Sequence, residues 1–152
     1  MFRVNSRQSV LHILTLTIVA FGLHYVWESV QCSALYEHGS FKATRWGMVM
    51  ATLGDVVITW ILYIVVAALS RRWRWTLSFW TWRQWLPLIA VALMIGVGIE
   101  LHALATGRWG YLPRTPIVPL LGVSIVALLQ LAILTPTAFL IADRALWKTP
   151  KR

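Results

Sequence analysis

The chain has little charge and few acidic residues. Charged residues fill 12% of its 152 positions, with 14 Lys and Arg against 5 Asp and Glu, whereas a soluble domain carries about 25%. Hydrophobic residues make up 59%, yet a soluble domain of this size buries only about 70% of the surface that its unfolded chain exposes. The composition excludes a soluble fold, a disordered chain and a collagen, and predicts one domain surrounded mostly by lipid.

Cysteine is almost absent, since Cys32 is the only one. One cysteine cannot form an intramolecular disulfide, a Cys-x-x-Cys redox pair or a thiolate zinc site. The histidines show no Glu-x-x-His repeat of the kind that supports a di-iron centre. Haem held by His24 and His102 is disfavoured, because His102 lies about 200° around a helix from Glu100. We expect no metal and no cofactor; an oxygen-rich cation site stays open as an alternative.

Charged residues are also missing from four long apolar stretches. A membrane-spanning helix needs about 20 mostly apolar residues. Residues 8–27 and 117–142 contain no Asp, Glu, Lys or Arg, and the two stretches between them contain only Asp55 and Glu100. No small-x-small cleavage pattern follows the first stretch, so we expect it to be retained. The sequence predicts an all-α bundle of four membrane-spanning helices, at 9–29, 47–69, 85–105 and 118–142.

Basic residues are distributed unevenly between the predicted spans. Ten Lys and Arg belong to the N-terminus, the 70–84 loop and the tail after Asp143, and four belong to the other two loops. Short cytoplasmic loops are enriched in Lys and Arg, so both termini are predicted to be cytoplasmic. The 71–85 stretch interleaves Arg with five of the ten Trp, which is typical of the inner membrane interface. Membrane lipids are therefore the expected partner of this stretch, and nucleic acid is not.

Three carboxylates share the half of the bilayer that this orientation makes the outer one. Ionisable residues inside a bilayer are costly and are usually functional. Glu28 lies near the outer end of the first span, Asp55 about 12 Å into the second, and Glu100 a turn from the outer end of the third. We expect no carboxylate in the inner half.

Helical spacing collects polar residues on single faces. One stripe at i, i+3, i+4 and i+7 contains His24, Trp27, Glu28 and Gln31. A second contains Thr52, Asp55, Thr59 and Tyr63. Gly96 leaves room for close approach one turn before Glu100, and Gln130 is predicted near the middle of the fourth span. These faces predict a polar pocket inside the bundle that opens outward.

The outer loop 106–116 is predicted to cover this pocket. Arg108 can pair with one carboxylate and keep it ionised, while a desolvated neighbour holds its proton. Trp109 and Tyr111 belong to the same loop and either contact the bound molecule or anchor the loop at the interface.

An acid–base enzyme acting on a lipophilic or amphipathic molecule is the first functional hypothesis. Asp55 would be the buried acid and Glu100 or Glu28 the base or cation stabiliser. The residues predicted to bind the substrate are His24, Trp27, Gln31, Arg108, Trp109, Tyr111 and Gln130. Proton transfer, isomerisation or cyclisation would suit this set, with Trp rings facing positive charge.

Other interpretations stay open. Glu28 could reach lipid headgroups, Glu100 could only fix Arg108, and Gln130 could only join helices. At the level of function, an ion or small-solute transporter would need a homo-oligomer, since one protomer shows no hydrophilic path. An accessory or assembly subunit of a larger membrane complex would use the same polar faces to bind partner helices.

Four segments carry a resemblance. These are WE…Q…LY at Trp27–Tyr36, TLGDV at Thr52–Val56, ELHALATGRWGYLPRTP at Glu100–Pro116 and LLQ…LTP at Leu128–Pro136. With them the chain resembles a family of small bacterial four-helix integral membrane proteins. The resemblance implies the four-helix architecture, supports the residues selected above, and brings no activity. We expect the chain to lie in a bacterial inner membrane. A weaker likeness, in layout alone, is to membrane isomerases and cyclases of sterols and terpenoids.

Overall fold

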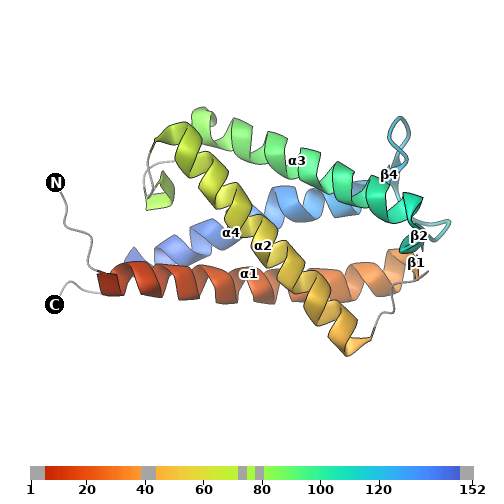
Figure 1. Cartoon of the computed structure of the whole chain (residues 1–152), viewed down its shortest axis with the longest axis horizontal. Coiled ribbons are helices and arrows are strands. Elements are labelled where there is room, and N and C mark those ends of the chain that lie inside the picture. The colour runs from red at the N-terminus through yellow and green to blue at the C-terminus, as the bar shows by residue number, and fades with distance from the viewer. Residues whose placement is uncertain (1–5, 39–43, 72–74, 78–80, 148–152) are drawn as a thin grey trace.

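Four long helices form a bundle with short strands at one end (Figure 1). The computed structural model describes residues 6–38, 44–71, 75–77 and 81–147. Its helices are α1 (Ser6–Leu35), α2 (Arg45–Ser70), α3 (Trp82–Ala105) and α4 (Ile125–Trp147). Each is long and apolar enough to cross a membrane, which confirms the helical architecture and is the make-up of a multi-pass membrane protein.

Polar and apolar residues are arranged in the reverse of a soluble protein. Ile18 and Met94 are 69% and 73% exposed on the outside of the bundle. His24, Glu100 and Gln130 are buried inside it. This distribution suits helices whose outer faces meet lipid and whose polar side chains satisfy one another within the bundle.

Three predicted boundaries are wrong, and one of them is the end of α4, at Trp147 rather than at 142. α1 continues to Leu35, six residues beyond the predicted end, and α4 begins at Ile125 rather than at 118. Residues 117–124 instead form an antiparallel pair, β3 (Ile117–Val118) with β4 (Val123–Ser124). Its turn contains Gly122 at φ +66°, a left-handed conformation that favours glycine and is incompatible with a continuous helix.

A two-stranded ribbon closes one end of the bundle, called the ribbon end below. β1 (Tyr36–His38) pairs antiparallel with β2 (Trp109–Tyr111). The segment after β2 is bound to the end of α1, because Leu112 N–H and Thr115 Oγ1 both donate to the Leu35 carbonyl, at 3.0 and 2.5 Å. The connection between α3 and α4 is therefore held across the end of α1. This is the position that a loop covering this end of the bundle would need.

The opposite end contains η1 (Trp75–Leu77), the start of α1 and the end of α4 (Figure 1). Here Trp75 is fully buried against Tyr63 and Phe139, and its indole N–H donates to the Tyr63 carbonyl at 3.1 Å. The prediction of an interfacial Trp is wrong for Trp75, because η1 turns this ring into the core. Trp82 remains exposed. The following residues of the 71–85 stretch and of the Lys and Arg count used for orientation lie outside the described residues: Arg3, Lys42, Arg72, Trp73, Arg74, Trp80, Lys148, Lys151 and Arg152.

The helices do not pack equally. α1 packs along both α2 and α4, and α3 packs mainly on α4. Gly96 allows α3 and α4 to approach closely, because a Cβ placed there would lie 3.1 Å from Leu128 Cδ2. α2 crosses the bundle obliquely and contacts α3 less extensively (Figure 1).

Candidate functional site

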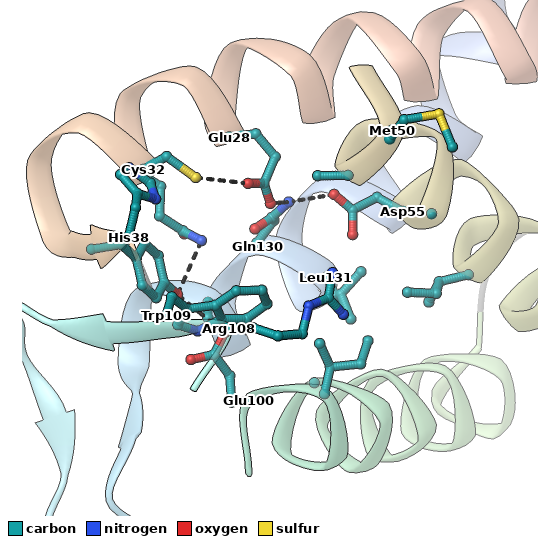
Figure 2. A pocket seen from close by; sticks show the side chains of 18 residues that line it. Glu28, Cys32, His38, Met50, Asp55, Glu100, Arg108, Trp109, Gln130 and Leu131 are labelled. Atoms are coloured by element: carbon teal, nitrogen blue, oxygen red, sulfur yellow. Dashed lines mark hydrogen bonds between the residues drawn. The ribbon is translucent and has the colours of Figure 1, made fainter. Parts of the chain in front are cut away.

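A cavity of about 280 Å³ lies inside the bundle at the ribbon end. Small-molecule sites occupy about this volume or more, and combine apolar walls with a few polar groups. Side chains from all four helices and from the ribbon line it (Figure 2). Seven of the predicted site residues are among them: Glu28, Gln31, Asp55, Glu100, Arg108, Trp109 and Gln130.

The amide of Gln130 joins two of the carboxyl groups. Its Nε2 donates to Glu28 Oε1 and to Asp55 Oδ2, each at 2.9 Å (Figure 2). Because α4 begins at Ile125, Gln130 lies in its second turn and not near the middle of the span as predicted. Three helices thus bring two acids to one amide.

His24 supports this group from behind and does not line the cavity. Its Nδ1 lies 3.2 Å from Gln130 Nε2 and 3.6 Å from Asp55 Oδ2, and its Nε2 lies 3.4 Å from Thr59 Oγ1. Thr59 donates its own proton to the Asp55 carbonyl at 2.9 Å, which leaves its oxygen free to accept from Nε2–H. With its proton on Nε2, His24 can donate to Thr59, and its Nδ1 then competes with Glu28 and Asp55 for the two N–H groups of Gln130. The predicted polar faces of α1 and α2 meet here.

Glu100 is held by two tyrosines of the ribbon. Tyr36 donates to Glu100 Oε1 at 3.1 Å, and Tyr111 donates to Oε2. The Tyr111 oxygen also accepts from the Ser124 N–H at 2.9 Å, and the Tyr36 oxygen accepts from Gln31 Nε2 at 3.2 Å. Burial, followed by the Glu100 charge for Tyr36 and by its hydrogen bond to Glu100 for Tyr111, raises the pKa of both phenols above the ordinary value. Both hydroxyls therefore remain donors, and Glu100 is an acceptor fixed on both oxygens.

Arg108 does not pair with Glu100, contrary to the prediction. Among the described residues the structure contains no ion pair between Arg108 and a carboxylate. Its guanidinium instead lies 5.3 Å from the centre of the Trp109 ring, at the exposed rim of the cavity. The tyrosines explain the difference, because they already occupy both oxygens of Glu100.

Besides His24, two predicted residues do not line the cavity, Tyr111, which instead holds Glu100, and Trp27. The Trp27 indole N–H donates to Gln31 Oε1 at 2.7 Å, and its ring lines an apolar groove between α1 and α4. It therefore orients Gln31, whose Nε2 is then directed to Tyr36.

Sequence reasoning left several lining residues unassigned. Tyr36, Cys32 and His38 come from the end of α1 and from β1, and Cys32 Sγ lies 3.3 Å from Glu28 Oε2. The signal that could have found Cys32 is its i+4 spacing from Glu28. Tyr36 becomes a site residue only through strand pairing with Tyr111, which no local pattern reveals.

A second polar cluster lies at the opposite end of the bundle. Asp143 Oδ1 accepts from Thr76 Oγ1 at 3.0 Å and lies 3.6 Å from His12 Nδ1. α4 continues to Trp147 and so includes Asp143, which the prediction left in the tail after the fourth span, and the described helices therefore carry a carboxylate at this end too. Within the described residues, no three His, Cys, Asp or Glu side chains at either end are placed to hold a metal ion.

The site stands on its geometry alone. Comparisons with protein families, with curated proteins and with solved structures found no match for this chain.

Proposed function

We propose that this chain is a multi-pass protein of the bacterial inner membrane that binds a lipophilic or amphipathic small molecule and converts it by acid–base chemistry of the isomerase or cyclase type. The excess of Lys and Arg near the termini favours cytoplasmic termini, which puts the cavity in the outer half of the bilayer. The observation that carries the proposal is the meeting of Glu28 and Asp55 at one amide beside a cavity. Paired carboxyl groups in different surroundings divide into an acid and a base.

The three carboxyl groups take different roles. Asp55, the deeper member of the pair, donates a proton to the bound molecule, and Glu28 accepts one. Glu100 keeps its position through Tyr36 and Tyr111 and stabilises positive charge that develops on the substrate. The Trp109 ring lines the same cavity and adds its electron-rich face.

Transport through one protomer is the weaker proposal. The second cluster at His12 and Asp143 supplies ionisable groups at the opposite end. Along α1, however, the fully buried Leu16 and Ala20 stand between His12 and His24 and belong to the apolar core. Apolar packing of this kind interrupts a hydrophilic path, so an enzyme or a binding protein suits the interior better.

The first test asks what the cavity retains. The full chain is purified in lipid nanodiscs as wild type, Asp55→Asn and Asp143→Asn, and bound small molecules are extracted and identified by mass spectrometry. We expect a molecule that is retained by wild type and Asp143→Asn and reduced about tenfold in Asp55→Asn, since the lost acid contributes about 1.4 kcal/mol or more. Asp143→Asn is the matched control, because it changes a buried Asp far from the cavity.

The second test asks about proton transfer. Wild-type protein incubated in D₂O with its retained molecule should introduce deuterium at carbon, because acid–base isomerisation exchanges C–H for C–D. Asp55→Asn should stop this exchange. Retention without exchange would leave a binding protein, and a partner protein co-purified at fixed stoichiometry in place of a small molecule would favour the accessory subunit.

A further inference from the structure

The rim of the cavity has a different composition from its floor. Between α2 and α3 its exposed lining side chains are apolar, namely Met50 on α2, 52% exposed, and Ile99 on α3, 37% exposed. Arg108, just before β2, is exposed on the ribbon side of the cavity. The labelled carboxyl and amide groups come from all four helices, Glu28 from α1, Asp55 from α2, Glu100 from α3 and Gln130 from α4 (Figure 2). The cavity therefore opens sideways between α2 and α3 through an apolar rim, while the ribbon lies across its end.

Gly54 leaves this rim open. It lines the cavity one residue before Asp55, and a Cβ placed on it would meet no heavy atom within 4 Å. Gly96, which lines the cavity from α3, is buried instead, with its space filled by Leu128. Because α2 leans on α1 and contacts α3 less, the space beside Gly54 is continuous with the surface that faces lipid. A molecule dissolved in the bilayer can reach Asp55 along this route without crossing water.

The acidic side chains that line the cavity favour one kind of polar head group on a ligand. The carboxyl groups of Glu28, Asp55 and Glu100 line the cavity and offer acceptor oxygens to a cationic donor. Arg108 is the cationic lining residue, and it sits at the exposed rim over Trp109. Aromatic rings of Tyr36 and Trp109 complete the wall. Carboxylates and ring faces together favour a cation, and a desolvated ammonium gains most from both.

We propose that the ligand of this cavity is a long-chain amphiphile with an ammonium head, which enters from the bilayer between α2 and α3 past Gly54. This inference rests on the proposed function and names its substrate class and route. The head reaches Asp55, Glu28 and Gln130, and the apolar chain lies along Met50, Ile58 and Ile99.

The test uses two photoactivatable probes in phosphatidylcholine nanodiscs, a hexadecylamine and a hexadecanol that carry the same diazirine in the chain. Crosslinked residues of the full chain are mapped by mass spectrometry. We expect the amine to label residues around the cavity about tenfold more than the alcohol does, the ratio that 1.4 kcal/mol gives. Equal labelling by both probes would overturn the ammonium head and leave the proposed function intact. Absence of cavity labelling by either probe, together with no retained molecule, would overturn both.

The route has its own matched variants. Gly54→Trp places an indole in the opening. Gly98→Trp is the control, because a Cβ at Gly98 also meets nothing within 4 Å and Gly98 does not line the cavity. We expect about a tenfold loss of amine labelling in Gly54→Trp and none in Gly98→Trp. Met50→Trp narrows the same opening and keeps the route testable should Gly54→Trp fail to fold. Full labelling in both rim variants would show that the ligand enters elsewhere.

Discussion

The two ends of the bundle use the same side chains in different surroundings. At the ribbon end His24 of α1 lies 3.6 Å from Asp55, and at the η1 end His12 of α1 lies 3.6 Å from Asp143. Each aspartate also has a threonine neighbour, Thr59 or Thr76. The first group borders a cavity, whereas the second is packed beside the aromatic core and lines neither of the spaces described above.

The comparison shows that a buried acid inside a helix bundle is not by itself a functional site. Asp143 receives one hydroxyl from η1 and so helps to attach that short helix to α4. Asp55 shares its amide partner with a second acid and faces an open space. The chemistry is expected where a ligand can reach the acids, and stability where the surroundings are packed.

The largest expected effect on stability is at the η1 end. Trp75→Ala removes a fully buried ring and its hydrogen bond to the Tyr63 carbonyl. We expect the free energy of unfolding to fall by about 3 kcal/mol, measured by SDS titration in detergent micelles. Trp82→Ala is the control, because that ring is 69% exposed, and it should change the value by less than about 0.5 kcal/mol. Equal effects of the two substitutions would show that the burial of Trp75 does not stabilise the η1 end.

An intermediate effect is expected in the ribbon. Tyr111→Phe removes the donor to Glu100 Oε2 and also leaves the Ser124 N–H without its acceptor. Tyr36→Phe removes the donor to the other oxygen and the acceptor for Gln31, whose side chain keeps its bond from Trp27. We expect losses of about 1.5 kcal/mol for Tyr111→Phe and about 1 kcal/mol for Tyr36→Phe in the same titration.

The control for this pair is Tyr25→Phe, since the Tyr25 ring stacks on Phe21 and the substitution keeps that contact. It should leave stability unchanged within about 0.5 kcal/mol. A larger loss for Tyr36→Phe than for Tyr111→Phe would show that the Tyr111 hydroxyl does not contribute more to stability than the Tyr36 hydroxyl.

Helical spacing was enough to predict what lies on α1, α2 and α3. The i, i+3, i+4 and i+7 pattern brought His24, Glu28 and Gln31 to one face, and all three are in or beside the cavity network. This succeeds because a side chain's direction on a helix follows from its number. Trp27 belongs to the same pattern and still misses the cavity, because a broad aromatic ring at the edge of a stripe can turn toward the neighbouring groove.

Local patterns did not predict the contacts made by strands. Tyr36 and Tyr111 are brought together by pairing between residues 75 positions apart, and the hydrophobic run from 117 to 124 resembles a helix although it forms a hairpin. Apolar residues suit a strand and a helix alike, so only Gly122 and the prolines nearby distinguished the two. The error at that boundary also misplaced Gln130, which is why its role as the amide between two acids was not foreseen.

The smallest effect is expected at Arg108. Its size distinguishes two ways of holding Glu100, an ion pair with Arg108 or hydrogen bonds from the two tyrosines. If an ion pair fixed Glu100, Arg108→Ala would cost several kcal/mol, because a buried carboxylate would lose its partner. In this structure the guanidinium is exposed and contacts the Trp109 ring, while the tyrosines hold Glu100. We therefore expect Arg108→Ala to lower the free energy of unfolding by about 0.5 kcal/mol at most, similar to Arg83→Ala at the exposed Trp82. A loss of 3 kcal/mol or more in the free energy of unfolding would show that Arg108 does form an ion pair with Glu100.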